Sequence, residues 1–257
     1  MRHGVELAGC FPTGRHYPGI AHLLRIVASG LADEFAGDHS MSNLRVVSID
    51  TETTGRDPTL DRIVEIACIT WDGNGVCARK SWLVNPGRPI PEEAFAVHGI
   101  GDADVAGKPS FAEVADEVLH EMEGAVPLAY NAEYDRKVLM AELGRLAGAA
   151  LRQPPAVRRT VEWIDPLVWA RELQRTEKSK SLGEVSLRLG IEIPQAHRAA
   201  DDAEAALRVL LAFARDSRVP RTYGAFMQEQ RRLWRLFEDE RKIWRSRSGP
   251  SLPTGVS

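Results

Sequence analysis

Two carboxylates that could bind a divalent cation follow the first strongly apolar run of the chain. Asp50 and Glu52 are separated by one residue in the stretch Ile49–Gly55. At this spacing in a strand, both side chains point to the same side of a sheet. Buried carboxylates are costly without a counter-charge, and Mg²⁺ and Mn²⁺ prefer oxygen ligands, so the pair indicates a metal site. The alternative is an ordinary polar turn.

Two later motifs offer side chains of the same kind. Asn131 and Asp135 follow the apolar run 126–130, and His197 precedes Asp202 by five residues. A histidine just before a helix that carries an acid in its first turns suits a general base beside a metal ligand. Each motif alone also has a simpler interpretation, because the first fits a helix-dipole partner and the second fits a helix cap.

Hydrophobic periodicity predicts the strands and helices that would carry these motifs. The first three strands would form an antiparallel meander with a turn at Asp72–Gly75. Asp165 is expected to cap the helix that begins at Pro166, and Asp201 is expected to be solvated. The order of elements indicates an α/β fold with a mixed sheet flanked by helices. Strands are expected at 44–50, 63–71, 78–85, 126–130 and 161–165, and the main helices at 110–122, 133–146, from 166 onward, at 181–190 and at 198–214.

Composition and charge argue against several classes of protein. The 257 residues carry a net charge of −3, but residues 44–214 carry −7 and residues 215–257 carry +5. An acidic body does not bind nucleic acid through bulk charge, so metal ions would have to offset its repulsion of phosphates. Three cysteines without CxxC spacing argue against a disulfide framework and a structural zinc site. No apolar run reaches the roughly 18 residues of a membrane span, and no secretory signal is visible, so a cytoplasmic location is expected.

In their order along the chain, the three acidic motifs resemble those of the DEDDh family of 3′→5′ exonucleases. Asp-x-Glu, Asn-x-x-x-Asp and His-x-x-x-x-Asp follow one another here as they do in that family. The stretches Ile63–Ala67 and Glu93–Ile100 are also similar to it. The resemblance covers about residues 44–214, and within the family it is strongest to the proofreading epsilon subunits of bacterial DNA polymerase III. Tyr130 is a departure, since the family often has histidine there.

The resemblance implies a ribonuclease-H-like fold and a two-metal mechanism. Two Mg²⁺ or Mn²⁺ ions would be held by Asp50, Glu52, Asp135 and Asp202, with Asp135 acting mainly through ordered water. His197 would accept the proton of the attacking water, which requires a neutral imidazole near pH 7–8.

The resemblance also implies a substrate, the 3′ end of a DNA strand. Stacking and backbone contacts would grip the terminal bases, which favours single-stranded or frayed ends. Glu93 and His98 would contact the terminal nucleotide. Glu93 could instead be a solvated acid at a helix start, and His98 could be a turn residue. An RNA-trimming exonuclease and a catalytically silent nucleic-acid-binding module are the alternative functions. The implied substrate contacts are Thr51, Thr53, Thr54, Glu93, His98 and Asn131.

Three segments are expected along the chain. Residues 1–43 would form a leader with one amphipathic helix, residues 44–215 the exonuclease domain, and residues 216–257 a basic amphipathic extension. In the extension, apolar residues such as Phe226 and Leu233 recur at helical spacing among arginines. This helix could pack on the domain, dock onto a partner such as a polymerase subunit, or steer a strand toward the acidic site.

Overall fold

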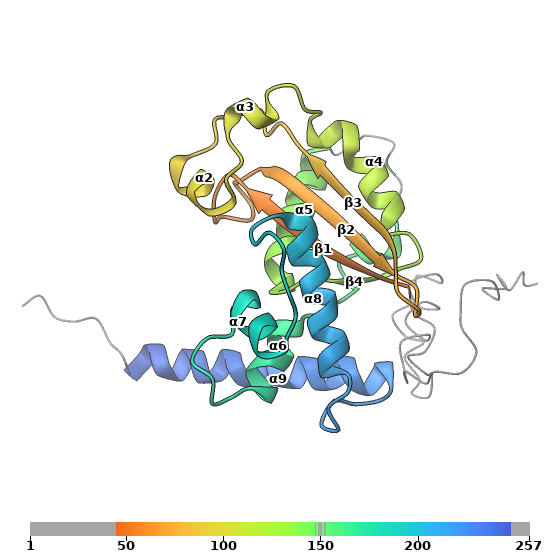
Figure 1. The fold of residues 1–257 in the computed structure, drawn as a ribbon, viewed down its shortest axis with the longest axis vertical. Helices are drawn as coiled ribbons and strands as arrows, with labels where there is room; N and C mark the ends of the chain where they lie inside the picture. The colour runs from red at the N-terminus through yellow and green to blue at the C-terminus, as the bar shows by residue number, and fades with distance from the viewer. Residues whose placement is uncertain (1–44, 147, 149–150, 152, 248–257) are drawn as a thin grey trace, which may run out of the picture.

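A four-stranded mixed sheet forms the centre of the computed structural model, which describes residues 45–146, 148, 151 and 153–247 (Figure 1). The expected leader helix at 1–43 lies outside the described residues. The strand order is β3-β2-β1-β4, in which β1 pairs antiparallel with β2 and parallel with β4, and β2 pairs antiparallel with β3. The predicted meander and mixed sheet are therefore confirmed. The strands are β1 (Val46–Thr53), β2 (Ile63–Trp71), β3 (Val76–Leu83) and β4 (Val126–Leu128).

The two central strands are buried along almost their whole length. All nine residues of β2 are buried, and β2 has the bounds that its run of apolar and β-branched residues predicts. β1 continues to Thr53, three residues beyond the expected end, because its pairing with β2 extends to Thr53 opposite Ile63. Asp50 and Glu52 consequently belong to the strand itself, and Glu52 lies opposite Glu65 of β2.

Helices cover both faces of the sheet and bury alternate residues of β2. Ala67 and Ile69 pack into one apolar cluster with α6, α8 and α9, whereas Ile66 and Cys68 pack into another with α4 and α5. In Figure 1, α8 crosses the near face of the sheet, and α4 and α5 lie behind it. The helices are α2 (Glu92–His98), α3 (Asp102–Val105), α4 (Phe111–Glu121), α5 (Ala132–Arg145), α6 (Pro166–Leu173), α7 (Leu182–Arg188), α8 (Ala199–Phe213) and α9 (Tyr223–Arg247), with a 3₁₀ turn at Pro155–Val157.

The strand expected at 161–165 is wrong, because only a single parallel bridge joins Ile164 to Leu128. Ile164 donates to the Pro127 carbonyl and accepts from the Ala129 N–H, and the next residue that would face β4, Pro166, has no N–H and begins α6. On the edge that faces away from β4, the Gln230 side chain donates to the Trp163 carbonyl at 3.0 Å and accepts from the Asp165 N–H at 3.0 Å. The ladder therefore stops at one bridge, and a side chain of α9 occupies the outer edge.

The cap predicted after this bridge is confirmed. Asp165 accepts a hydrogen bond from the Leu167 N–H at 2.9 Å, and α6 begins at Pro166. Asp165 is thus the N-cap of α6, as its position before a proline predicts.

The first half of α9 packs against the domain. Four of its apolar side chains are buried in the same cluster as α6 and α8, and the Phe226 ring stacks on Trp169 with 4.7 Å between centroids. Beyond Leu233 the helix becomes more exposed. None of the helices among the described residues is long and apolar enough to cross a membrane. The buried apolar residues are Tyr223, Phe226, Met227 and Leu233.

Phe226→Ala should lower the free energy of unfolding by about 3–5 kcal/mol, because it leaves a cavity beside Trp169. Urea denaturation of the full chain measures this loss. Ile243→Ala is the matched control on the same helix, since Ile243 is 50% exposed and should change stability by less than about 0.5 kcal/mol. Similar small losses in both variants would contradict the packing role of α9.

Candidate active site

Four carboxylates from three segments of the chain gather at the end of β1. Asp50 and Glu52 come from β1, Asp135 from the first turn of α5, and Asp202 from the first turn of α8. Asp135 is fixed by the Thr51 hydroxyl, which donates to its Oδ1 at 2.7 Å. The partial positive charge at a helix N-terminus favours an acid there, which accounts for the placement of two of the four groups.

The charges of these groups act on one another. Burial raises the pKa of Asp50 well above its ordinary value, and the charges of Asp135, Glu52 and Asp202 raise it further. Burial, followed by the charge of Asp202, raises the pKa of Glu52 to about 8. Burial also raises the pKa of Asp135 to about 7 and that of Asp202 above its usual range. The four acids therefore share one electrostatic environment, in which burial and mutual repulsion outweigh the nearby positive charge of Arg198.

A divalent cation would relieve this repulsion, and the donor atoms suit one. Glu52, His197 and Asp202 each present a ligand atom, and these atoms lie within 4.8 Å of one another. Carboxylate oxygens are the ligands that Mg²⁺ and Mn²⁺ prefer. The residues present at the site thus fit a divalent metal.

Two residues at the site have left-handed backbone, which is uncommon outside glycine. His197 has φ 61° and Asn131 has φ 64°, and no other non-glycine residue among those described has positive φ. The His197 N–H donates to Asp202 Oδ2 at 3.0 Å, so the bend ties the histidine to the carboxylate. The Asn131 N–H donates to Asp165 Oδ1 at 2.9 Å. Such backbone persists only where its surroundings hold it, and it is frequent at functional sites.

An ion pair between a buried glutamate and a partly exposed arginine anchors the start of α8. Glu65 is 1% exposed, and it accepts both hydrogen bonds of the Arg198 guanidinium at 2.9 and 3.0 Å. It also accepts from the Ala199 N–H at 3.2 Å and the Ser81 hydroxyl at 2.9 Å. Burial alone would raise the pKa of Glu65, but the hydrogen bonds from Arg198 and Ser81 outweigh it and hold the pKa below its ordinary value.

Sequence reasoning missed this pair. The visible signal is an acid in the middle of an apolar strand together with an arginine directly after the candidate general base. Because the pair holds Arg198 and Ala199, it positions His197 on one side and Asp202 on the other.

A cavity of about 680 Å³ adjoins the carboxylates. Its volume falls within the range of ligand pockets. Among the described residues, Arg56 is the only lysine or arginine in its lining. Asn131, the sixth predicted substrate contact, is not one of the lining residues. Five predicted substrate contacts line it, namely Thr51, Thr53, Thr54, Glu93 and His98.

His98 takes the turn role that its sequence context allows, and its contact with a nucleotide stays a prediction. Its Nδ1 accepts from the Ile100 N–H at 3.0 Å, which closes the turn after α2. Its Nε2 is buried near the Thr53 backbone without a partner that meets hydrogen-bond geometry. Burial lowers the pKa of His98.

Tyr134 is a further lining residue that the sequence reasoning missed. Its hydroxyl lies 2.7 Å from the Thr53 hydroxyl and donates to the Gly55 carbonyl at 2.8 Å. The ring therefore forms a fixed wall of the cavity. Its signal in the sequence is its place directly before Asp135 on α5.

One acid near the site differs from its predicted state. Asp201 was expected to be solvated, but it forms an ion pair with Arg79 of β3 and its side chain is only 14% exposed. Because Arg79 also bonds to Glu204, Asp201 is held toward β3. Its neighbour Asp202 is the residue that joins the cluster.

Comparison with known proteins gives consistent results. A family model described as an exonuclease (RNase_T) matches residues 47–210. The DNA polymerase III subunit epsilon of Treponema pallidum is 32% identical over 162 residues, covering 63% of this chain and 73% of that protein. A DNA polymerase III subunit epsilon-like protein of Rhodobacter capsulatus is 38% identical over 208 residues, covering 77% of this chain. That alignment spans only 28% of the R. capsulatus protein.

Solved structures agree on the fold. Escherichia coli exonuclease I in complex with a dT13 oligonucleotide superposes with a TM-score of 0.57 and 23% identity, covering 69% of this chain and 42% of that chain. At this identity the likeness establishes a shared ribonuclease-H-like architecture and nothing finer. The predicted fold class is therefore confirmed.

The raised pKa of Glu52 predicts how stability depends on pH without metal. The folded-state value of about 8 lies above the ordinary 4.5, so the folded protein holds a proton that the unfolded chain releases. The stability that the folded state gains by holding this proton is fully present below pH 4.5. It is lost as the pH rises from 4.5 to about 8. In EDTA, Glu52→Gln should therefore gain thermal stability over the natural protein as the pH increases from 5 to 8.

Thermal denaturation at several pH values in EDTA measures this difference. Glu177→Gln is a control, because Glu177 is exposed and remote in sequence from the cluster. A stability difference between Glu52→Gln and the natural protein that stays constant from pH 5 to 8 would contradict the electrostatic description of the site.

Proposed function

Because the chain belongs to the exonuclease family whose model matches residues 47–210, we propose that it removes nucleotides one at a time from the 3′ end of DNA in a reaction that requires divalent cations. The observation that carries the proposal is a cluster of four carboxylates at the end of β1, beside a cavity of about 680 Å³. Nuclease activity follows from the family. The direction of digestion, the substrate and the number of metals are the proposed parts.

In this proposal the four acids are metal ligands. Asp50, Glu52 and Asp202 would hold one cation, and Asp50 with Asp135 would hold a second, Asp135 mainly through water. When bound, the cations would polarise the scissile phosphate and make water a stronger nucleophile at neutral pH. Thr51 keeps Asp135 in place through its 2.7 Å hydrogen bond.

His197 is the proposed general base. Its side chain is exposed at the mouth of the cluster, and its backbone N–H is bonded to Asp202. A neutral imidazole accepts the proton of the attacking water and returns it to solvent. The left-handed bend and the Glu65–Arg198 pair hold the residue for this step.

The cavity is the proposed site of the terminal nucleotide. Its backbone and hydroxyl groups at Thr51–Thr54 suit the sugar, and the free Nε2 of His98 suits a polar atom of the same nucleotide. Tyr134 offers a ring for stacking. Arg56 supplies the positive charge that a phosphate requires. A single nucleotide fits such a pocket once it leaves the duplex, which favours single-stranded or frayed ends.

Two relatives are named for DNA polymerase III subunit epsilon, which favours DNA as the substrate and a polymerase as a partner. The test is digestion of 5′- and 3′-labelled single-stranded, mismatched and duplex oligonucleotides, with matched RNA strands and with EDTA. Loss of the 3′ label first, on DNA, and only with Mg²⁺ or Mn²⁺, is the expected result. Loss of the 5′ label first, faster digestion of RNA, or no digestion with either metal would overturn it.

Asp202→Asn should reduce the rate of Mn²⁺-dependent digestion by more than about 100-fold, because a metal ligand is lost. Asp201→Asn is the matched control, since the adjacent acid is bound to Arg79. Single-turnover digestion of a labelled DNA strand measures both. Equal activity of the two variants would remove Asp202 from the proposed ligand set.

His197→Gln should lower kcat by about 10²- to 10⁴-fold with little change in KM, because the proton acceptor is lost while the nucleotide cavity is intact. The pH–rate profile provides the second readout. The rise in kcat that accompanies deprotonation of an imidazole should disappear in the variant. If the profile keeps that rise, another group is the base.

A further inference from the structure

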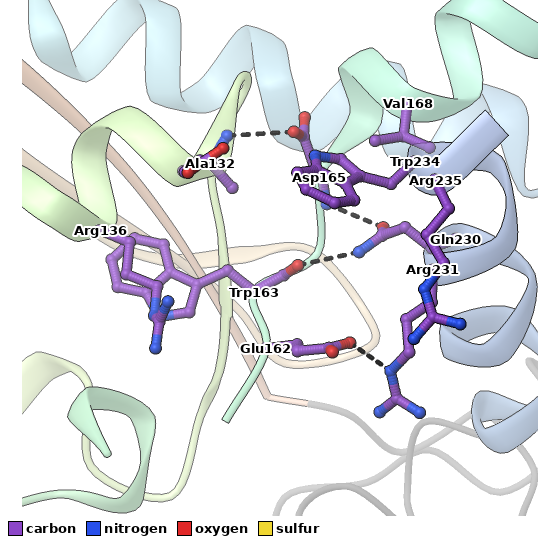
Figure 2. A pocket seen from close by; sticks show the side chains of 11 residues that line it. Ala132, Arg136, Glu162, Trp163, Asp165, Val168, Gln230, Arg231, Trp234 and Arg235 are labelled. Carbon is purple, nitrogen blue, oxygen red and sulfur yellow. Dashed lines mark hydrogen bonds and ion pairs between the residues drawn. The ribbon is translucent and has the colours of Figure 1, made fainter. Parts of the chain in front are cut away.

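A second cleft, of about 340 Å³, lies between the N-terminal end of α5, residues 162–168 and α9 (Figure 2). The α9 wall of the cleft lies beyond residues 47–210, the part of the chain that the family model matches.

Hydrogen bonds attach this cleft to the turn that carries Asp135. The Asp165 carboxylate accepts from the N–H groups of Asn131 and Ala132 at 2.9 and 3.2 Å (Figure 2 shows the bond to Ala132). Gln230 of α9 bonds to the backbone of residues 163 and 165. The α9 wall, residues 162–168 and the start of α5 are thus joined into one surface.

Every carboxylate in the lining already has a partner. Glu162 pairs with Arg231 at 2.6 Å, and Glu133 pairs with Lys137 at 2.6 Å. Asp165 is occupied by the backbone N–H groups that it caps. The acids of the cleft therefore leave little negative charge to repel an anion.

Two arginines in the lining lack an acidic partner among the described residues. Arg136 donates only to the Arg159 carbonyl at 2.8 Å, and its buried Nε has no partner. Arg235 forms no ion pair, although its neighbours Arg232 and Arg241 on α9 pair with Glu229 and Glu238. The guanidinium groups of Arg136 and Arg235 are consequently available to bind phosphates.

An aromatic ring completes the cleft. Trp234 is 42% exposed, and in Figure 2 its side chain extends from α9 across the cleft toward Asp165 and Val168. Exposed aromatic rings beside unneutralised arginines bind single-stranded nucleic acid by base stacking and phosphate contacts. Residues 215–257, which include the α9 wall, carry +5, whereas residues 44–214 carry −7.

The two clefts meet the same turn of α5 from different sides. Ala132 and Glu133 line the second cleft, and Tyr134 lines the catalytic cavity. A helix with its side chains is about 10–12 Å across, which a strand crosses in a few nucleotides. We propose that the second cleft binds the upstream part of the single strand whose 3′ end lies in the catalytic cavity, an inference that rests on the proposed function.

The test uses the full chain with Trp234→Ala and Arg235→Ala, separately and together. Binding of a labelled 20-nucleotide DNA strand is measured in EDTA by fluorescence anisotropy. We expect roughly 5- to 100-fold weaker binding, because base stacking on one ring has that value. Arg235→Ala should also reduce the slope of log affinity against log salt by about 0.7, the value for one phosphate contact on a single strand.

Two controls accompany these variants. Arg241→Ala removes an exposed arginine of the same helix that is paired with Glu238, so strand binding should be unchanged. The p-nitrophenyl ester of thymidine 5′-monophosphate has no upstream strand, so Trp234→Ala and Arg235→Ala should cleave it at the natural rate.

Three results would be decisive. Unchanged strand binding in the double variant would overturn the proposal, and so would an equal loss of activity on the ester, which would mean that α9 acts only by packing. If the natural protein cleaved neither substrate yet bound the strand through Trp234, the second cleft would be supported and the nuclease proposal would be contradicted.

Discussion

Repulsion among carboxylates is the constraint on which the rest of this structure depends. Asp50, Glu52, Asp135 and Asp202 are drawn into one partly buried space, where burial and mutual charge disfavour ionisation. A chain that held these groups loosely would let them separate. Here each is attached to a rigid element, two to the central strand β1 and two to helix N-termini, whose dipoles partly offset the charge.

Neutral and paired groups around the cluster complete this arrangement. Thr51 points to the opposite side of β1 from its two acidic neighbours and bonds to Asp135, so one short strand segment positions three of the four acids. Glu65 accepts two hydrogen bonds from the Arg198 guanidinium, and this ion pair fixes the start of α8. Arg198, the positively charged residue nearest the cluster, is therefore already paired with Glu65. The four carboxylates remain available to bind a metal.

The sequence predicts those parts of the molecule that depend on local pattern. β2 has its expected bounds because nine buried residues form one continuous run, and Pro166 marks the start of α6 because Asp165 caps it. The four acids could be assigned to one site because their motifs follow one another in the same order as in the DEDDh exonuclease family. The fifth strand stops at a single bridge because Pro166, the next residue that would face β4, has no N–H, and the bonds from Gln230 to the outer edge of this segment are contacts that no local pattern contains. Tyr134 and the Glu65–Arg198 pair likewise depend on tertiary proximity.

Because Gln230 attaches α9 to residues 163 and 165, the part of the chain that matches the family depends on a helix beyond it. A fragment that ended at residue 210 would retain all four acids and His197, yet it would uncover Trp169 and release the backbone of residues 163 and 165. The turn at Asn131 would then lose the support that reaches it through Asp165. The unit of this protein that can fold by itself therefore extends past residue 210 and includes α9, which lies beyond the residues that the family model matches.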